Sequence, residues 1–270
     1  MGRHLAGPRR LRQPPRVGEA GGDAAARAGA APPGARTAQP RLLRLLADRP
    51  FARSELVEIG GERWVRKRFR LPLAGAALAP LARALMRHEL ANCRRVEGIP
   101  GVAARAHAHS EEVLLREWVE GTDLRTLRRR GAPLPDAFFD ELAEILAAIH
   151  ARGLAYNDLE KKDNVLLTAT GHPMLVDFQI CLRRYDGTSR ALRRLSGWLL
   201  GQLQRQDRRY LYKMKRRFRP DLLTAEEARL ARVRPALARA YLPFWHLLHR
   251  LKRLLYPKGR DQGFRFSRRP

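Results

Sequence analysis

The sequence predicts an α+β protein of two lobes, with a small β-rich lobe first and a larger helical lobe after it. Two observations point to this order. Two β-rich runs, residues 56–59 and 64–69, lie on either side of Gly60-Gly61. After residue 135 the apolar residues recur mostly at helical spacing, interrupted by one short hairpin pattern. Strands that precede helices, instead of alternating with them, are typical of α+β folds.

The chain has 270 residues, enough for two small lobes that share a cleft. Residues 1–40 are mainly Ala, Gly, Pro and Arg, and they hold too few large apolar side chains to offset the entropy of ordering. We therefore expect this segment to be disordered. The folded domain is expected at 41–257, with its N-terminal lobe at 41–117 and its C-terminal lobe at 118–257, followed by a basic tail at 258–270.

Several features favour a cytoplasmic protein. The first residues lack the apolar core of a signal peptide. The longest uncharged apolar run, residues 71–82, is about 12 residues long, whereas a membrane-spanning helix needs roughly 20. The two cysteines, Cys93 and Cys181, are too few for a disulfide framework or a metal-ligand set.

Three patterns predict the elements of the first lobe. Gly60-Gly61 between two β-rich runs predicts a hairpin, because glycine takes a positive φ without steric cost. Residues 113–119 are predicted to form a further strand. Residues 78–96 are predicted to form a helix with one apolar face, made of Leu78, Leu81, Leu85, Cys93 and Val96.

The second lobe is predicted to be mostly helical. Pro135-Asp136 begins a helix whose apolar residues recur at helical spacing. Two short apolar runs, residues 165–167 and 174–176, form a hairpin around Gly171, and from Leu192 onward the chain reads as helical and basic. The apolar positions of the first of these helices are Phe138, Leu142, Ile145 and Ile149.

Glu89 is the first candidate site residue. At 100° per residue it falls within the apolar arc of the helix 78–96. A carboxylate on an apolar face is costly unless a cation meets it, and the candidate cation is Lys67, which ends the strand run Val65-Arg66-Lys67. The alternative is a slight rotation of the helix that brings Glu89 to water.

A second polar cluster lies around the hairpin 165–176. Asn164 precedes its first strand and Asp177 follows its second, so the two can bind one hard cation such as Mg²⁺, which prefers oxygen ligands. Asp158 is then free to orient a hydroxyl nucleophile, while Lys161 or Lys162 can neutralise phosphate oxygens. Each residue alone is typical of a turn or a helix cap. Their combination and order predict a site for phosphoryl transfer.

This ordered set of residues resembles the protein-kinase-like superfamily over residues 42–182, about half of the chain. The resemblance implies the two-lobed kinase fold, ATP and Mg²⁺ as cofactors, and transfer of the γ-phosphoryl group of ATP to a hydroxyl acceptor. Lys67 is similar to the strand lysine that holds the α- and β-phosphates, and Glu89 to its helix partner. Asp158 resembles the catalytic aspartate, and Asn164 and Asp177 resemble the metal ligands.

The resemblance also assigns the segment between the lobes. Backbone groups from Glu117 to Val119 are expected to bind adenine, with Asp123 near the ribose, and Lys161 is expected to assist Asp158 in catalysis. The loop from Asp158 to Asn164 is one residue longer than in ordinary kinases. The extra acid, Asp163, is expected to point away from Asn164 as the strand begins.

Other positions depart from the usual kinase pattern. Residues 49–54 contain no glycine where a phosphate loop would precede Lys67, and Tyr156-Asn157 stands for His-Arg. Gln179 replaces the glycine of the Asp-Phe-Gly motif, and no Ala-Pro-Glu segment follows. These changes are similar to short bacterial kinases of the RIO and lipopolysaccharide-kinase groups.

The charge is strongly positive and uneven. The formal net charge is +27, and a surplus of 19 positive charges lies from Arg183 to the end. Such a surplus favours anionic partners, although an arginine-rich composition alone would also produce it. The aromatic, leucine-rich and basic segment 241–256 suits a helix packed on the larger lobe or a helix at the inner membrane surface. Nucleic acid is the least favoured partner, because no binding motif is recognisable.

The sequence thus predicts a serine/threonine-kinase-like phosphotransferase. Three alternatives stay open: a kinase of a sugar or lipid-linked glycan that uses the same residues, a pseudokinase that binds nucleotide without turnover, and a basic nucleic-acid-binding module. The presence of all five core residues argues against a pseudokinase, and the missing glycine loop argues for one. Neither the acceptor nor the oligomeric state can be read from the residues.

Overall fold

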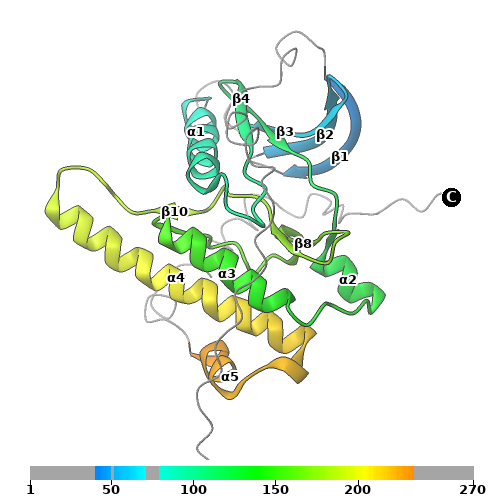
Figure 1. The fold of residues 1–270 in the computed structure, drawn as a ribbon. Helices are drawn as coiled ribbons and strands as arrows, with labels where there is room; N and C mark the ends of the chain where they lie inside the picture. The colour runs from blue at the N-terminus through cyan, green and yellow to red at the C-terminus, as the bar shows by residue number, and fades with distance from the viewer. Residues whose placement is uncertain (1–39, 50–51, 71–78, 234–270) are drawn as a thin grey trace, which may run out of the picture.

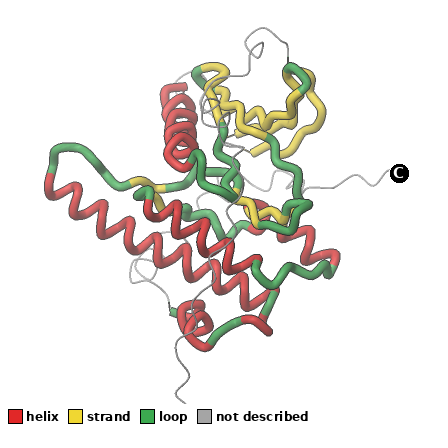
Figure 2. The backbone as a smooth tube through the Cα atoms, viewed as in Figure 1, coloured by secondary structure: helices red, strands yellow, loops and turns green. Residues whose placement is uncertain are grey.

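A computed structural model describes residues 40–49, 52–70 and 79–233. It shows the predicted two lobes, a curved sheet with one helix beside it and a larger lobe that is mostly helical (Figure 1). The tube in Figure 2 shows how strands gather in one lobe and helices in the other. Four predictions fall outside the described residues: disorder at 1–39, the start of the helix at Leu78, the segment 241–256 and the tail 258–270.

The N-terminal lobe is built on an antiparallel five-stranded sheet in the order β1-β2-β3-β5-β4. The hairpin around Gly60-Gly61 is confirmed, since the two glycines have φ of 60° and 80° and connect β2 to β3. Positive φ at both central residues is the turn that matches the twist of paired strands. The strands are β1 (Arg41–Arg49), β2 (Ala52–Ile59), β3 (Glu62–Phe69), β4 (Ala106–Ser110) and β5 (Val113–Glu117).

The predicted helix is α1 (Ala79–Val96), which lies beside the sheet. Cys93 and Val96 are buried as predicted, but Leu81 is 47% exposed and Leu85 is only partly buried. The prediction for Leu81 is wrong because the helix meets the sheet along the stripe that begins one residue later. The buried residues of this stripe are Ala82, Met86, Glu89, Cys93 and Val96.

The C-terminal lobe begins after Glu117 with two short elements, β6 (Thr122–Asp123) and α2 (Leu124–Arg130). The predicted helix follows as α3 (Phe138–Ala151), and the predicted hairpin as β8 (Val165–Leu167) and β9 (Pro173–Leu175), with β6 as a third strand. The basic helix is confirmed as α4 (Arg190–Phe218). The remaining elements are β7 (Leu154–Ala155), η3 (Lys162–Asn164), β10 (Leu182–Arg183), η4 (Pro220–Leu222) and α5 (Ala225–Arg232).

One apolar core runs through both lobes. It joins Phe69 and Met86 of the smaller lobe to Leu142 and Leu146 of α3, all 3% exposed or less. A separate cluster fills the other face of the sheet and includes Trp64. The segment after α1 is also tied to the larger lobe, because Ala103 N donates to Leu175 O at 3.0 Å. Among the described residues, no helix is both long and apolar enough to cross a bilayer.

Candidate active site

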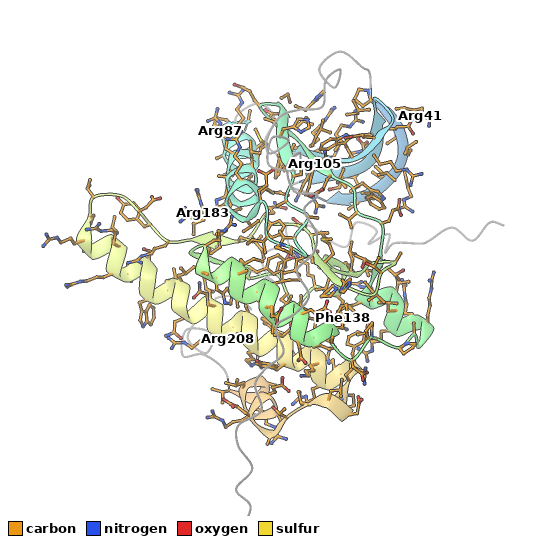
Figure 3. All side chains as sticks on the ribbon, viewed as in Figure 1. Arg41, Arg87, Arg105, Phe138, Arg183 and Arg208 are labelled. Atoms are coloured by element: carbon orange, nitrogen blue, oxygen red, sulfur yellow. The ribbon has the colours of Figure 1, made fainter. Side chains whose placement is uncertain are left out.

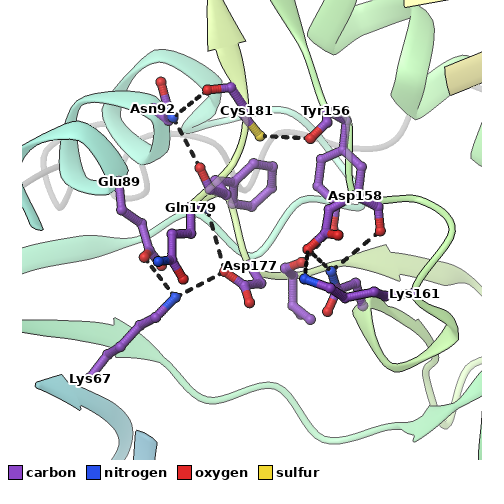
Figure 4. Close-up of polar contacts among 12 residues, drawn as sticks. Lys67, Glu89, Asn92, Tyr156, Asp158, Lys161, Asp177, Gln179 and Cys181 are labelled. Carbon is purple, nitrogen blue, oxygen red and sulfur yellow. Dashed lines mark hydrogen bonds and ion pairs between the residues drawn. The ribbon is translucent and has the colours of Figure 1, made fainter. Parts of the chain in front are cut away.

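A buried ion-pair cluster joins the two lobes, as Figure 4 shows. Lys67 Nζ lies 2.7 Å from Glu89 Oε2 and 3.0 Å from Asp177 Oδ1. The lysine comes from β3, the glutamate from α1, and the aspartate from the segment after β9. Glu89 is fully buried. The prediction that Lys67 meets Glu89 is therefore confirmed, and the rotated-helix alternative is excluded.

Burial and charge act against each other on these three groups. Burial lowers the pKa of Lys67, but attraction by Asp177 and Glu89 outweighs it, so the pKa is raised. Burial, together with the negative charge of Asp177, raises the pKa of Glu89 despite the charge and the hydrogen bond of Lys67. Burial also acts to raise the pKa of Asp177, yet the charges of Lys67 and Arg116 bring it well below its ordinary value. Asp177 is thus held firmly as a carboxylate.

The predicted catalytic loop is compact and internally bonded. Asp158 is 5% exposed, and its Oδ2 accepts from Lys161 Nζ at 2.6 Å and from Asn164 Nδ2 at 2.7 Å. None of the contacts in the described part of the chain uses Asp158 Oδ1. Burial raises the pKa of Asp158, and the hydrogen bond and charge of Lys161 offset part of that rise. Asp158, Lys161 and Asn164 thus lie together as predicted.

Asn164 and Asp177 lie on neighbouring chain segments, because Val176 N donates to Asn164 O at 3.1 Å. Asn164 uses its amide nitrogen toward Asp158, and Asp177 uses Oδ1 toward Lys67, which leaves one side-chain oxygen on each. Two oxygen ligands fit Mg²⁺, which usually keeps several waters and takes the rest of its ligands from phosphate. The residues therefore fit the predicted cation.

Asp177 also has an uncommon backbone conformation, with φ of 69°. A non-glycine residue in this left-handed region is held there by its surroundings, and such residues gather at functional sites. Asp163, the confounding acid next to Asn164, points elsewhere: its Oδ1 lies 2.6 Å from Arg125 Nε of α2. Leaving Asp163 out of the metal site is consistent with this contact.

Sequence reasoning missed the residue that anchors this loop. Asp207 of α4 is fully buried and accepts backbone hydrogen bonds from Tyr156 N and Asn157 N, both at 2.8 Å. Its Oδ2 also lies 3.0 Å from His150 Nε2. Tyr156 in turn connects this loop to the segment before Asp177, because its hydroxyl donates to Val176 O at 2.5 Å. The signal in the sequence was a lone acid on the apolar face of a very basic helix.

Asn92 is a second residue that was missed. It is fully buried on α1, one turn after Glu89, and its Nδ2 donates to Phe178 O at 3.0 Å and to Cys181 O at 3.2 Å. Asn92 therefore ties α1 to the segment that carries Asp177. Its position three residues after Glu89, on the same helix face, was the available clue.

The segment between the lobes lies where it was predicted, and the hydrogen bonds of its residues in the structure are structural ones. Glu117 Oε1 accepts from Arg105 N at 2.9 Å, which fixes the end of β5 to the chain before β4. Asp123 caps α2: its Oδ1 accepts from Thr126 N at 2.9 Å and its Oδ2 from Thr126 Oγ1 at 2.8 Å. Val119 is half-buried. Adenine binding at Glu117 and Val119 and ribose binding at Asp123 stay predictions.

The departures from the kinase pattern are visible in the structure. Arg49 pairs with Ala52 across β1 and β2, so Pro50 and Phe51 alone connect these strands, and neither is glycine. Gln179, at the motif glycine, is half-buried, and its backbone N lies 3.4 Å from Asp177 Oδ1.

The fold and the site together define a class: a two-lobed, kinase-like α+β protein in which the five predicted site residues are gathered where the lobes meet. No protein-family model matches the chain. Three curated relatives are all eukaryotic kinases. They are a serine/threonine-protein kinase of Arabidopsis thaliana (34% identical over 117 residues), a protein kinase of Oryza sativa subsp. indica (36% over 114 residues) and a probable cAMP-dependent protein kinase catalytic subunit of Encephalitozoon cuniculi (33% over 100 residues).

These similarities cover part of each chain. They include 40%, 40% and 34% of this chain, and 22%, 19% and 31% of the respective relatives. The chain therefore spans less than a third of the length of the curated relatives it matches. The similarity supports the protein-kinase-like superfamily, and these relatives are protein kinases of eukaryotes, so the predicted likeness to bacterial RIO and lipopolysaccharide kinases is not confirmed.

Proposed function

We propose that the protein is an ATP-dependent phosphotransferase that moves the γ-phosphoryl group of Mg-ATP to a hydroxyl acceptor. The observation that carries this proposal is the single ammonium of Lys67 held between Glu89 and Asp177, beside the Asp158–Asn164 loop. An ammonium has three donors, and two are used by the carboxylates. The third has no acceptor in the described part of the chain and can donate to a phosphate oxygen.

The residues divide the work of such a transfer. Lys67 would hold the α- and β-phosphates, while Asn164 and Asp177 would hold Mg²⁺, which neutralises charge on the transferred phosphate. Asp158 would accept a hydrogen bond from the acceptor hydroxyl and orient it in line with the γ-phosphate. Its raised pKa makes it a better proton acceptor than an ordinary aspartate. Lys161, bonded to Asp158, would neutralise phosphate oxygens as the bond breaks.

The acceptor we propose is a serine or threonine hydroxyl of a protein, in line with the printed names of the relatives. A sugar or lipid-linked glycan is the alternative acceptor, suggested by the likeness to short bacterial kinases of the RIO and lipopolysaccharide-kinase groups. We further propose a cytoplasmic location, with the basic residues beyond Arg183 able to meet the anionic inner face of a membrane.

The test is incubation of the purified protein with γ-labelled ATP, Mg²⁺ and fractionated cell extract. Label in protein is expected with the wild type and not with Lys67→Met. Arg68→Met is the matched control, because Arg68 is exposed on the same strand and should leave labelling unchanged. Label in glycan would support the alternative acceptor. Nucleotide binding without consumption of ATP would establish a pseudokinase instead.

A further inference from the structure

Arg116 is a charged residue of the site that the proposed chemistry does not use. It is the fourth residue of β5, directly opposite Val65 of β3, while Leu114 is opposite Lys67. Residues opposite each other on antiparallel strands share a face, and residues two apart along a strand share it too. Arg116 therefore lies on the same face of the sheet as Lys67, between Lys67 and the segment that follows Glu117.

The guanidinium of Arg116 has no hydrogen-bond partner in the described part of the chain. Its Nε and Nη1 are enclosed and unpaired, and Nη2 is the nitrogen that is not enclosed. Glu89 Oε1 is likewise buried and unpaired. Arginine is always ionised and has donors only, so burying it without an acceptor is costly. No hydrogen bond to a described residue uses these donors, so they are left for an acceptor that enters.

The charge of Arg116 acts at the phosphate end of the proposed site. It contributes to the electrostatics of Lys67, Glu89 and Asp177, the three groups of the buried ion-pair cluster. In the sequence, residues 49–54 hold no glycine, and Pro50 has no backbone N–H. A side-chain donor can take the place of a backbone donor of a glycine-rich loop.

We propose that Arg116 binds the polyphosphate of the nucleotide, as a second, half-buried cation on the same sheet face as Lys67 that donates hydrogen bonds to phosphate oxygens. This inference rests on the proposed function, since it needs a nucleotide in the cleft. A bound phosphate supplies the oxygen acceptors that the guanidinium lacks in the free protein. It also explains how a chain without a phosphate loop would hold a triphosphate.

The test compares Arg116→Met with Arg116→Lys and with the control Arg68→Met, a surface arginine of β3. Dissociation constants are measured by calorimetry for Mg-ATP, Mg-GTP and adenosine. We expect Arg116→Met to raise the dissociation constants for Mg-ATP and Mg-GTP alike, by roughly tenfold or more, because a charged hydrogen bond is lost. Adenosine should bind equally well to the wild type and to Arg116→Met, because it has no phosphate. Arg116→Lys should retain most of the affinity for ATP.

Thermal unfolding of the free proteins separates a binding role from a structural one. Replacing a half-buried charge that has no hydrogen-bond partner among the described residues by a methionine should leave the melting temperature unchanged or raise it. The proposal is overturned if ATP affinity is unchanged in Arg116→Met, or if both Arg116 variants lose their fold. A loss of affinity for GTP alone would also overturn it, because Arg116 would then bind an oxygen of the guanine base and not the phosphates. A wild type that binds no nucleotide at all would refute the proposed function itself.

Discussion

A few polar atoms at the site each serve more than one partner. Asp158 uses one carboxylate oxygen for both Lys161 and Asn164, and in the described part of the chain its other oxygen has no partner. Asp177 gives one oxygen to Lys67, which leaves the other for the proposed cation. Separate acids for metal and acceptor are needed because a carboxylate that binds a dication is a poor proton acceptor.

Asp177→Asn should abolish metal-dependent nucleotide binding and turnover together, because it removes the charge that faces Mg²⁺. Asp158→Asn should keep the affinity for Mg-ATP nearly intact and lower the rate by roughly 10²-fold or more, the usual scale for a positioned acid–base group. The measurements are nucleotide titration with and without Mg²⁺ and steady-state turnover. Full turnover in Asp158→Asn together with loss of turnover in Asp163→Asn would show that Asp163, and not Asp158, is the catalytic aspartate of this loop.

At the scale of elements, the connection between α1 and β4 is fixed to the larger lobe. Leu175 N donates to Gly101 O at 2.8 Å, and Ala103 N donates to Leu175 O at 3.0 Å. Gly101 has φ of 77°, and an added Cβ would overlap the side chain of Ile145 in α3. Gly98 in the same connection has φ of 81°, yet an added Cβ there would meet nothing within 4 Å.

The two glycines give a matched pair of substitutions. Gly98→Ala should cost about 1–2 kcal/mol of unfolding free energy, because alanine is strained at positive φ. Gly101→Ala should cost about 1–3 kcal/mol more, since the added methyl group also overpacks the contact with Ile145. Urea denaturation measures both. Equal losses would mean that the contact between this connection and α3 is looser than the structure shows.

Asp207 couples α4 to the catalytic loop, and its removal should be severe. Asp207→Ala leaves the backbone N–H groups of Tyr156 and Asn157 buried or half-buried without their acceptor, which should cost roughly 2–5 kcal/mol of unfolding free energy. Turnover should fall with it, because these groups orient Asp158. Asp186→Ala, at an exposed aspartate, is the control. Unchanged melting temperature and turnover in Asp207→Ala would contradict this role.

The features predicted from the sequence are those determined by residues close together in the chain. Contacts between residues far apart in the chain were mostly missed. The Gly60-Gly61 turn and the spacing of α3 are encoded within a few residues. β1 was missed because Leu42, Leu43 and Leu45 are exposed, so no buried alternation marks it as a strand. Glu89 and Lys67 could be paired because a buried acid demands a cation. The partners of Asp207 lie about 50 residues away, and no spacing rule reaches them.

At the scale of the whole molecule, the positive charge is carried on its surface, where arginines project from α1, β1 and α4 (Figure 3). The first turns of α4 expose Leu192, Leu195 and Trp198 beside Arg193 and Arg194. No acid occurs between Asp186 and Asp207. This combination of apolar and basic side chains suits an anionic surface.

Binding to polyanions should therefore depend on salt. Retention on heparin or on anionic vesicles should fall as salt is raised, because exposed charges are screened beyond about 8 Å at physiological ionic strength. Replacing Arg193 and Arg194 together by glutamine should lower the salt concentration needed for elution from anionic vesicles. Retention that is equal at low and high salt would count against an electrostatic surface.

The fixed connection after α1 also has a mechanical consequence. Because Gly101 and Ala103 are bonded to Leu175, and Asn92 to Phe178 and Cys181, the C-terminal half of α1 is held to the larger lobe, and a tilt of the helix must strain these bonds. Glu89 is seven residues from Val96, or about 10 Å along the axis at 1.5 Å per residue. A tilt of about 10° would then carry the Glu89 carboxylate about 2 Å, enough to part it from Lys67. Such a tilt would uncouple the pair, and the hydrogen bonds of Gly101, Ala103 and Asn92 oppose it.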